Sequence, residues 1–127
     1  MEMFNFWPVL FGHWTADYLL QSKKMAVEKA GNLKVCLLHC LIYAASVGLW
    51  YGIVDWCKVP MVMVLAFISH FPIDYWSLAA KWLKLIKGRD VMDAFNRENP
   101  DPFAALIYAA VDNGMHLALL YLAMQSI

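Results

Sequence analysis

The four histidines of this 127-residue chain are spaced as if they belonged to one reactive or metal-binding site. Three of them have an aspartate four residues away, in the pairs His13 and Asp17, His70 and Asp74, and Asp112 and His116; the fourth is His39. Residues four apart lie on one face of a helix, about 6 Å apart along its axis. Each pair is therefore expected to present an imidazole and a carboxylate together.

Imidazole and carboxylate are a ligand set that suits zinc, and also iron or manganese. The predicted metal ligands are His13, Asp17, His39, His70, Asp74, Asp112 and His116. These residues exceed the need of one tetrahedral ion, so they could hold two metals, or one metal with an orienting carboxylate and a general base. We expect a divalent metal cofactor, with zinc as the first choice. One of Asp17, Asp74 and Asp112 would be the catalytic base that activates water.

Two other interpretations of the same residues stay open. They could form a structural hydrogen-bond network that ties helices together. They could also form a relay that conducts protons or ions. Three neighbouring residues are predicted to contact a substrate: Tyr18, Gln21 and Tyr75. Of these, Gln21 lies one turn beyond Asp17 and could bind a head group, although a hydrogen bond at the end of its helix is the simpler role.

The elements that must position these residues are apolar and long. The chain is 62% hydrophobic and 16% charged, against about 45–50% and about 25% in soluble domains. So short a chain cannot hide that much apolar surface in one core. A membrane-spanning helix needs about 20 mostly apolar residues, and the segments that qualify are 3–21, 35–54, 59–80 and 102–125. We expect an all-α integral membrane four-helix bundle, with residues 1–127 forming a single transmembrane domain.

The basic residues predict how the segments are oriented. Nine of the ten lie in the connections after the first and third segments, and Lys58 alone lies between the second and third. Basic connections stay in the cytoplasm, so both termini are expected on the extracytoplasmic side of a bacterial inner membrane. In the longest connection, Val91, Met92 and Phe95 could share one face of a short interfacial helix. The net charge of zero gives no reason to expect nucleic acid as a partner.

A weak internal repeat supports a shared site. The stretch GHWTADY at residues 12–18 is echoed by SHFPIDY at residues 69–75. Parallel repeats in membrane proteins place a common site where the two halves meet.

The order of these motifs resembles a family of small membrane proteins from bacteria and phages, known as domain of unknown function 3307. The matching elements are HWTADYLLQ at residues 13–21, His39, SHFPIDY at residues 69–75 and DNGMH at residues 112–116. Asn113 stands where the family often has glutamine. The resemblance covers essentially the full length and implies a helical bundle with this motif, but no reaction. A looser similarity of site type exists to membrane-bound metal-dependent hydrolases.

The leading hypothesis is a membrane-embedded metal-dependent hydrolase that acts on a lipid or a lipid-linked phosphate or ester. The first alternative is a small transporter or a conduit for protons or metal ions. The second is a non-catalytic membrane protein that binds partner subunits through its apolar helices, with the loops, including residues 93–101, as the docking surface. The expected partners are the lipid bilayer and a lipid substrate, and assembly into a homo-oligomer stays open.

Overall fold

The computed structural model describes residues 5–88 and 98–127, and this part of the chain is helical with no strand. The segments of regular structure are α1 (Phe6–Trp14), the π-helix η1 (Thr15–Leu20), α2 (Lys23–Glu28), α3 (Leu33–Gly52), the 3₁₀ turn η2 (Trp56–Lys58), α4 (Val59–Tyr75), α5 (Leu78–Lys87) and α6 (Pro102–Met124). The interfacial helix expected around Val91, Met92 and Phe95 lies outside the described residues.

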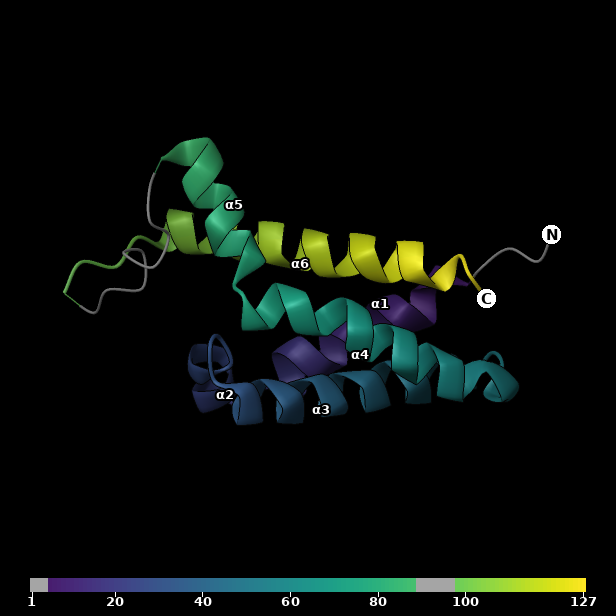
Figure 1. The fold of residues 1–127 in the computed structure, drawn as a ribbon. Helices are drawn as coiled ribbons and strands as arrows, with labels where there is room; N and C mark the ends of the chain where they lie inside the picture. Colours follow the sequence, from purple (N-terminus) through teal and green to yellow (C-terminus); the bar gives the residue numbers. More distant parts are fainter. Residues whose placement is uncertain (1–4, 89–97) are drawn as a thin grey trace.

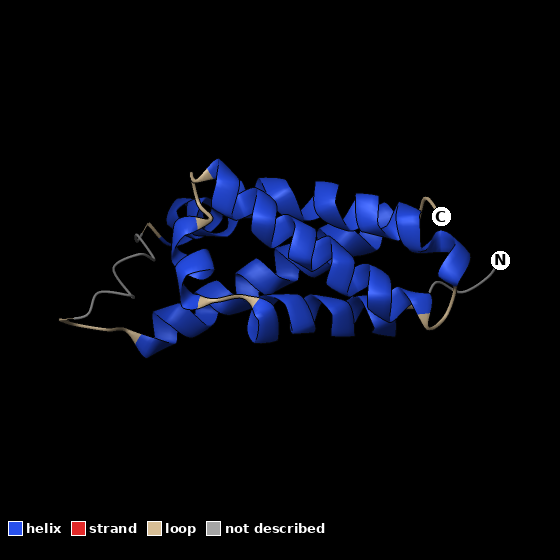
Figure 2. Cartoon of the chain, turned by 90° about the horizontal axis from the view of Figure 1, so that it is seen from below, coloured by secondary structure: helices blue, strands red, loops and turns tan. Residues whose placement is uncertain are grey.

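Helices α1, α3, α4 and α6 lie side by side along one axis, as Figures 1 and 2 show. Helix α1 contacts α3 and α6, and α4 contacts the same two helices from the other side. The start of α1, the turn η2 and the end of α6 share one end of the molecule, where Lys58 Nζ donates to the Ile127 carbonyl at 3.3 Å. The short helices α2 and α5 lie at the opposite end (Figure 1).

Three stretches are long and apolar enough to cross a membrane: Leu33–Gly52, Trp56–Tyr75 and Pro102–Met124. Their outward side chains are large and apolar, as Leu41, Val64 and Leu106 illustrate. These three stretches meet the expectation of membrane-length helices for the second, third and fourth segments. The first segment is helical from Phe6 to Leu20, but it is divided between α1 and η1.

The third segment ends earlier than the sequence suggests. A continuous helix was expected over 59–80, but α4 ends at Tyr75, and Ser77 adopts a left-handed backbone with φ of 49°. The chain then turns into α5, whose Leu83 packs against Ile107 and Val111 of α6. Residues 78–80 are apolar helix formers, so hydropathy alone does not reveal this turn.

Helices α1 and α3 approach each other closely at Gly12. A Cβ atom built on Gly12 would lie 2.5 Å from the Cα of Val47, which is too close for any larger residue without a backbone shift. The neighbouring core contains Val9, Ala16 and Tyr43, all almost completely buried. The position next to His13 is therefore set by direct contact between two helix backbones.

At the start of the π-helix η1, side-chain hydroxyls donate hydrogen bonds to backbone carbonyls of α1. Thr15 Oγ1 donates to the Phe11 carbonyl at 2.8 Å, and Ser46 Oγ of α3 donates to the Gly12 carbonyl at 3.0 Å. The indole of Trp50 in turn donates to Thr15 Oγ1 at 3.0 Å. Short π-helical segments are rare and are often found at functional sites, and this one carries Asp17.

Candidate metal centre

The predicted ligands meet in the interior, where five helical elements contribute to one polar cluster. Helix α1 supplies His13, η1 supplies Asp17, α3 supplies His39, and α4 and α6 supply the remaining pairs. Each of the four histidines is at most 2% exposed. Buried ionisable groups among apolar helices are costly and usually functional.

At the centre of the cluster, two imidazoles face each other. The Nε2 atoms of His39 and His70 are 3.0 Å apart. Two carboxylates approach the same point, with Asp17 Oδ1 at 3.2 Å and Asp74 Oδ2 at 3.1 Å from His39 Nε2. From His70 Nε2, the corresponding oxygens lie at 3.7 Å for Asp17 and 2.9 Å for Asp74. Two nitrogen and two oxygen donors thus converge from three segments.

The second oxygen of Asp74 extends the cluster to α6. Asp74 Oδ1 lies 3.2 Å from the Nε2 atom of His116, and Asp112 Oδ2 lies 3.6 Å from the same nitrogen. The ring of His116 also stacks on that of His70, with centroids 4.0 Å apart. One carboxylate therefore bridges the two halves of the cluster.

This arrangement fits a bound metal ion. Ligand atoms of a tetrahedral zinc site with bonds of about 2.0–2.1 Å lie about 3.3 Å from each other, which is close to the separations in the cluster. The donors form two groups, and the ligand atoms within each group lie within 4.8 Å of one another. One group is Asp17, His39 and His70, and the other is His70, Asp74 and His116. The two groups comprise five of the seven predicted ligands.

Several atoms of the cluster also lack a hydrogen-bond partner. Among the described residues, Asp17 Oδ1, Asp74 Oδ2 and His116 Nε2 are buried, and their close contacts with imidazole, carboxylate and ammonium groups do not have hydrogen-bond geometry. Buried polar atoms of this kind are expensive unless they are paired or coordinate a metal. These atoms, which are close to charged groups but not hydrogen-bonded to them, and the donor set both suit a metal cation.

The other two predicted ligands lie at the edge of the cluster. His13 places Nδ1 3.0 Å from the hydroxyl of Tyr43 and 3.4 Å from Asp17 Oδ2, and its Nε2 lies 2.8 Å from Asn113 Oδ1. Asp112 Oδ2 lies 3.6 Å from His116 Nε2, and the Asp112 side chain is 18% exposed. Both positions suit orientation or proton transfer better than the centre of a coordination shell.

One member of the cluster was missed by the sequence analysis. Lys29 Nζ lies 2.8 Å from Asp74 Oδ2, and the lysine side chain is only 11% exposed. Burial alone would lower the pKa of Lys29, but the carboxylates of Asp74 and Asp17 outweigh it and hold this pKa above its ordinary value. The ammonium group is therefore charged at neutral pH.

No spacing pattern connects Lys29 to the aspartates. It reaches them because Gly31, with φ of 75°, turns the chain and donates its N–H to the Tyr75 carbonyl at 3.1 Å. From the sequence, this lysine counts among the basic residues of a connection, because a buried partner on a distant helix gives no local signal.

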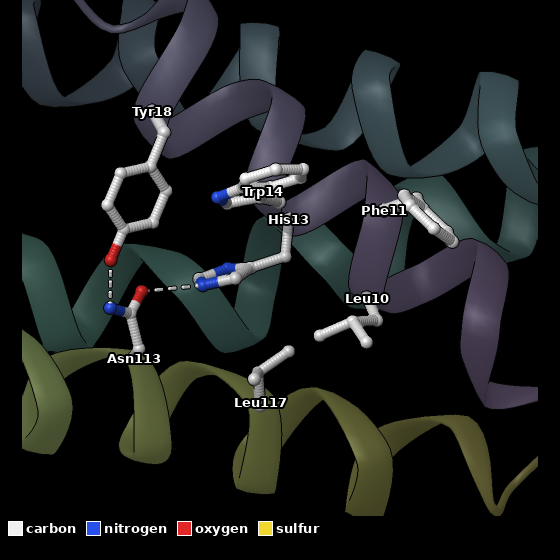
Figure 3. Close-up of a pocket in the computed structure, with 7 residues that line it drawn as sticks. All are labelled: Leu10, Phe11, His13, Trp14, Tyr18, Asn113 and Leu117. Atoms are coloured by element: carbon white, nitrogen blue, oxygen red, sulfur yellow. Dashed lines mark hydrogen bonds between the residues drawn. The ribbon is translucent and has the colours of Figure 1, made fainter.

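The three predicted substrate contacts have different surroundings. Gln21 lines a cavity of about 560 Å³ that also reaches Lys29 and Asp74, and the buried Gln21 Oε1 has no partner among the described residues. Tyr18 accepts a hydrogen bond from Asn113 Nδ2 and lines a second cavity, of about 430 Å³ (Figure 3). Tyr75 stacks on Phe71, with centroids 5.2 Å apart, and lines neither cavity.

Comparisons with known proteins place the chain in a family. Neither the curated proteins nor the solved structures give a match to it. The model of one family, described as "Protein of unknown function (DUF3307)", matches residues 6–127, nearly the whole chain. The buried histidines and aspartates of the cluster all lie within that range. The chain belongs to the DUF3307 family.

Proposed function

We propose that this protein is a membrane-embedded, metal-dependent hydrolase that acts on a lipid or a lipid-linked phosphate or ester. The observation that carries the proposal is the meeting of two imidazole nitrogens, from His39 and His70, with carboxylate oxygens of Asp17 and Asp74 at 2.9–3.7 Å. Such a donor set is poorly satisfied by hydrogen bonds and well suited to zinc, iron or manganese.

Each residue of the cluster then has a role. His39, His70 and Asp17 would hold one ion, and His116 with Asp74 would extend the donor set toward α6. Zinc held by these residues would supply a water nucleophile at neutral pH, because zinc lowers the pKa of bound water to about 7. Asp112 is the candidate general base, because it is outside both donor groups and is the most exposed of the three aspartates.

The proposed setting is a bacterial inner membrane crossed by all four segments as a bundle. Lysines support the orientation, because α2 and α5 carry Lys23, Lys24, Lys81, Lys84 and Lys87 at one end of the molecule. That end would face the cytoplasm, with both termini on the opposite side. The contact between Lys29 and Asp74 supports a metal centre near the cytoplasmic face in this orientation.

Replacing Asp112 by asparagine separates catalysis from metal binding. We expect Asp112→Asn to keep the metal and to lower hydrolysis of lipid phosphates or esters by about 10²–10⁴-fold, the usual contribution of a general base. Metal content is measured by mass spectrometry on the purified protein and hydrolysis by product release, with Asp55→Asn in the exposed turn as the control. If Asp112→Asn hydrolyses the substrate as fast as the wild type, Asp112 is not the general base.

A conduit for protons or metal ions is the second candidate, and one observation favours it. Close contacts run without a break from Lys29 through Asp74, His39 and Asp17 to His13. Chains of this kind line proton pathways in pumps and transporters. Purified protein in liposomes would conduct protons or metal ions if this function were correct, and conduction would be lost in His39→Ala. Hydrolysis without ion flux would exclude it.

A further inference from the structure

We infer that the substrate is a phosphate-bearing lipid that binds along the seam between the first helical segment and α6, with its phosphate beside Lys29 and Lys23 and its hydrocarbon chain in the groove above Asn113. This inference names the substrate class of the proposed hydrolase and so rests on that function. It distinguishes a phosphate from a neutral ester, which the metal centre alone does not do.

The head-group site is the cavity of about 560 Å³ at the end of the molecule that carries α2. Two lysines, Lys23 and Lys29, line it together with Gln21. Lysine binds phosphate as a point charge, and the orphaned Gln21 Oε1 leaves a buried polar atom for a hydroxyl or water of the head group. A neutral ester needs neither lysine.

The cavity also leads to the metal centre, because Asp74 is part of its wall. In the structure Lys29 neutralises Asp74 at 2.8 Å. A cation held by Asp74 would take over that neutralisation and leave the Lys29 ammonium to an anionic ligand. A phosphate at this position would lie next to the residues proposed to hold the metal.

The tail site is the groove of about 430 Å³ shown in Figure 3. Its walls are the apolar side chains of Leu10, Phe11, Trp14 and Leu117, and several of them are also exposed on the outer surface. His13 and Asn113 form its polar end, where Asn113 holds both the His13 ring and the Tyr18 hydroxyl. An apolar groove that opens between membrane helices fits a hydrocarbon chain.

The two sites follow the same seam. On the first segment, Tyr18 lines the groove and Gln21, less than one turn further, lines the cavity. On α6, Asn113 lines the groove and Tyr108 lines the cavity. Among the described residues, no Cα atoms of η1 and α6 approach within 8 Å, so side chains such as those of Tyr18 and Asn113 span the gap there. From Gln21 to Leu10 is about 16 Å along the helix, roughly half of the hydrocarbon thickness of about 30 Å. A lipid lying here would have its head at the basic end and its tail toward the bilayer centre.

Binding is tested with phosphatidic acid that carries brominated acyl chains, which quench nearby tryptophans. The full chain is placed in phosphatidylcholine nanodiscs, in the Asp112→Asn background so that the lipid is not consumed. Other exposed tryptophans are also quenched by the brominated lipid, so we expect a saturable component of the quenching that is specific to Trp14 and disappears in Trp14→Phe. We also expect Lys23→Met and Lys29→Met each to raise the half-saturating concentration by about tenfold, as loss of one charge-assisted contact does.

Matched controls make each outcome decisive. Lys24→Met, on the same helix but outside the cavity, should bind like the parent protein. Brominated diacylglycerol, which has the same chains without the phosphate, should bind at least about tenfold more weakly than phosphatidic acid by the same reasoning. If Lys29→Met does not fold, Lys23→Met carries the test alone, because Lys23 is exposed at the start of α2.

Three results would overturn the inference. Equal binding of diacylglycerol would show that the phosphate is not recognised. Unchanged binding in Lys23→Met would show that the cavity is not the head-group site. Displacement by inorganic phosphate as effectively as by unbrominated phosphatidic acid would mean a site for free phosphate without a tail site. Lipid binding as expected, with no phosphate released by the wild-type protein, would leave the lipid site standing and remove the hydrolase function.

Discussion

At the scale of single residues, the centre depends on one carboxylate with several partners. Asp74 Oδ2 lies within about 3 Å of Lys29 and His70 and its Oδ1 faces His116. Opposite charges stabilise a buried carboxylate, and removing one partner leaves the other uncompensated. Lys29 therefore acts as the counter-charge of Asp74 when no metal is bound.

A lysine replacement tests this counter-charge. We expect Lys29→Met to destabilise the metal-stripped protein by about 3–5 kcal/mol, the cost of breaking a buried ion pair. Added zinc should restore much of that loss, because the cation replaces the ammonium beside Asp74. Denaturation in detergent measures both effects, and Lys24→Met is the matched control. Equal stability of the two variants in the metal-stripped state would show that the contact is unimportant.

The residue types at the centre could be predicted from the sequence, but their partners could not. The spacing of four identified His70 with Asp74, and these side chains do lie 2.9 Å apart. Spacing carries no information about which helices pack together. The contact between His39 and His70, and the stacking of Tyr43 on His70 at 3.6 Å, depend on the packing of α3 against α4.

At the scale of elements, the close contact of α1 with α3 holds the first half of the site. Gly12 permits the approach, and the hydrogen bond from Ser46 to the Gly12 carbonyl holds it in register. The adjacent His13 and the π-helical Asp17 take their positions from this contact. The sequence predicts a helix here, but a π-helical segment leaves no trace in hydropathy, and neither does the turn at Ser77 that ends the third segment early.

Two glycine replacements separate packing from helix propensity. Gly12→Ala should lower stability by about 1–3 kcal/mol, the cost of overpacking, and should reduce metal content, because α1 must move away from α3. Gly114→Ala is the control, since a Cβ there meets nothing within 4 Å, and the better helix former should leave stability equal or higher. Thermal unfolding and metal analysis are the measurements. A Gly12→Ala protein as stable as Gly114→Ala would argue against the close approach.

At the scale of the whole molecule, the polar cluster lies nearer to one end than to the other. Lys29 reaches it from the connection between η1 and α3, while Cys57 is exposed in the turn at the far end. Composition and the basic connections predicted membrane-length helices and a sidedness. The division of the first segment, and the way α5 folds back on α6, come from side-chain packing that no single segment encodes.

Thiol labelling tests the proposed sidedness. Cys36 and Cys40 are buried and Cys57 is exposed, so the wild-type chain offers one accessible thiol. A membrane-impermeant maleimide should label Cys57 in intact spheroplasts. In the Cys57→Ser background, Lys87→Cys on α5 should react only after the membrane is opened. The reverse pattern would invert the topology, and labelling of both sites in intact spheroplasts would contradict a membrane-spanning arrangement.

The central claim is that the buried histidines and aspartates hold a metal ion, and metal content tests it most directly. Protein purified in detergent without chelators, and again after incubation with zinc, iron or manganese, is analysed by mass spectrometry. We expect at least one equivalent of metal per chain in the wild type and in Lys24→Met, and a loss of at least about tenfold in affinity in His70→Ala. A wild-type chain that holds no metal under any of these conditions, or a folded His70→Ala protein that holds as much as the wild type, would contradict the claim.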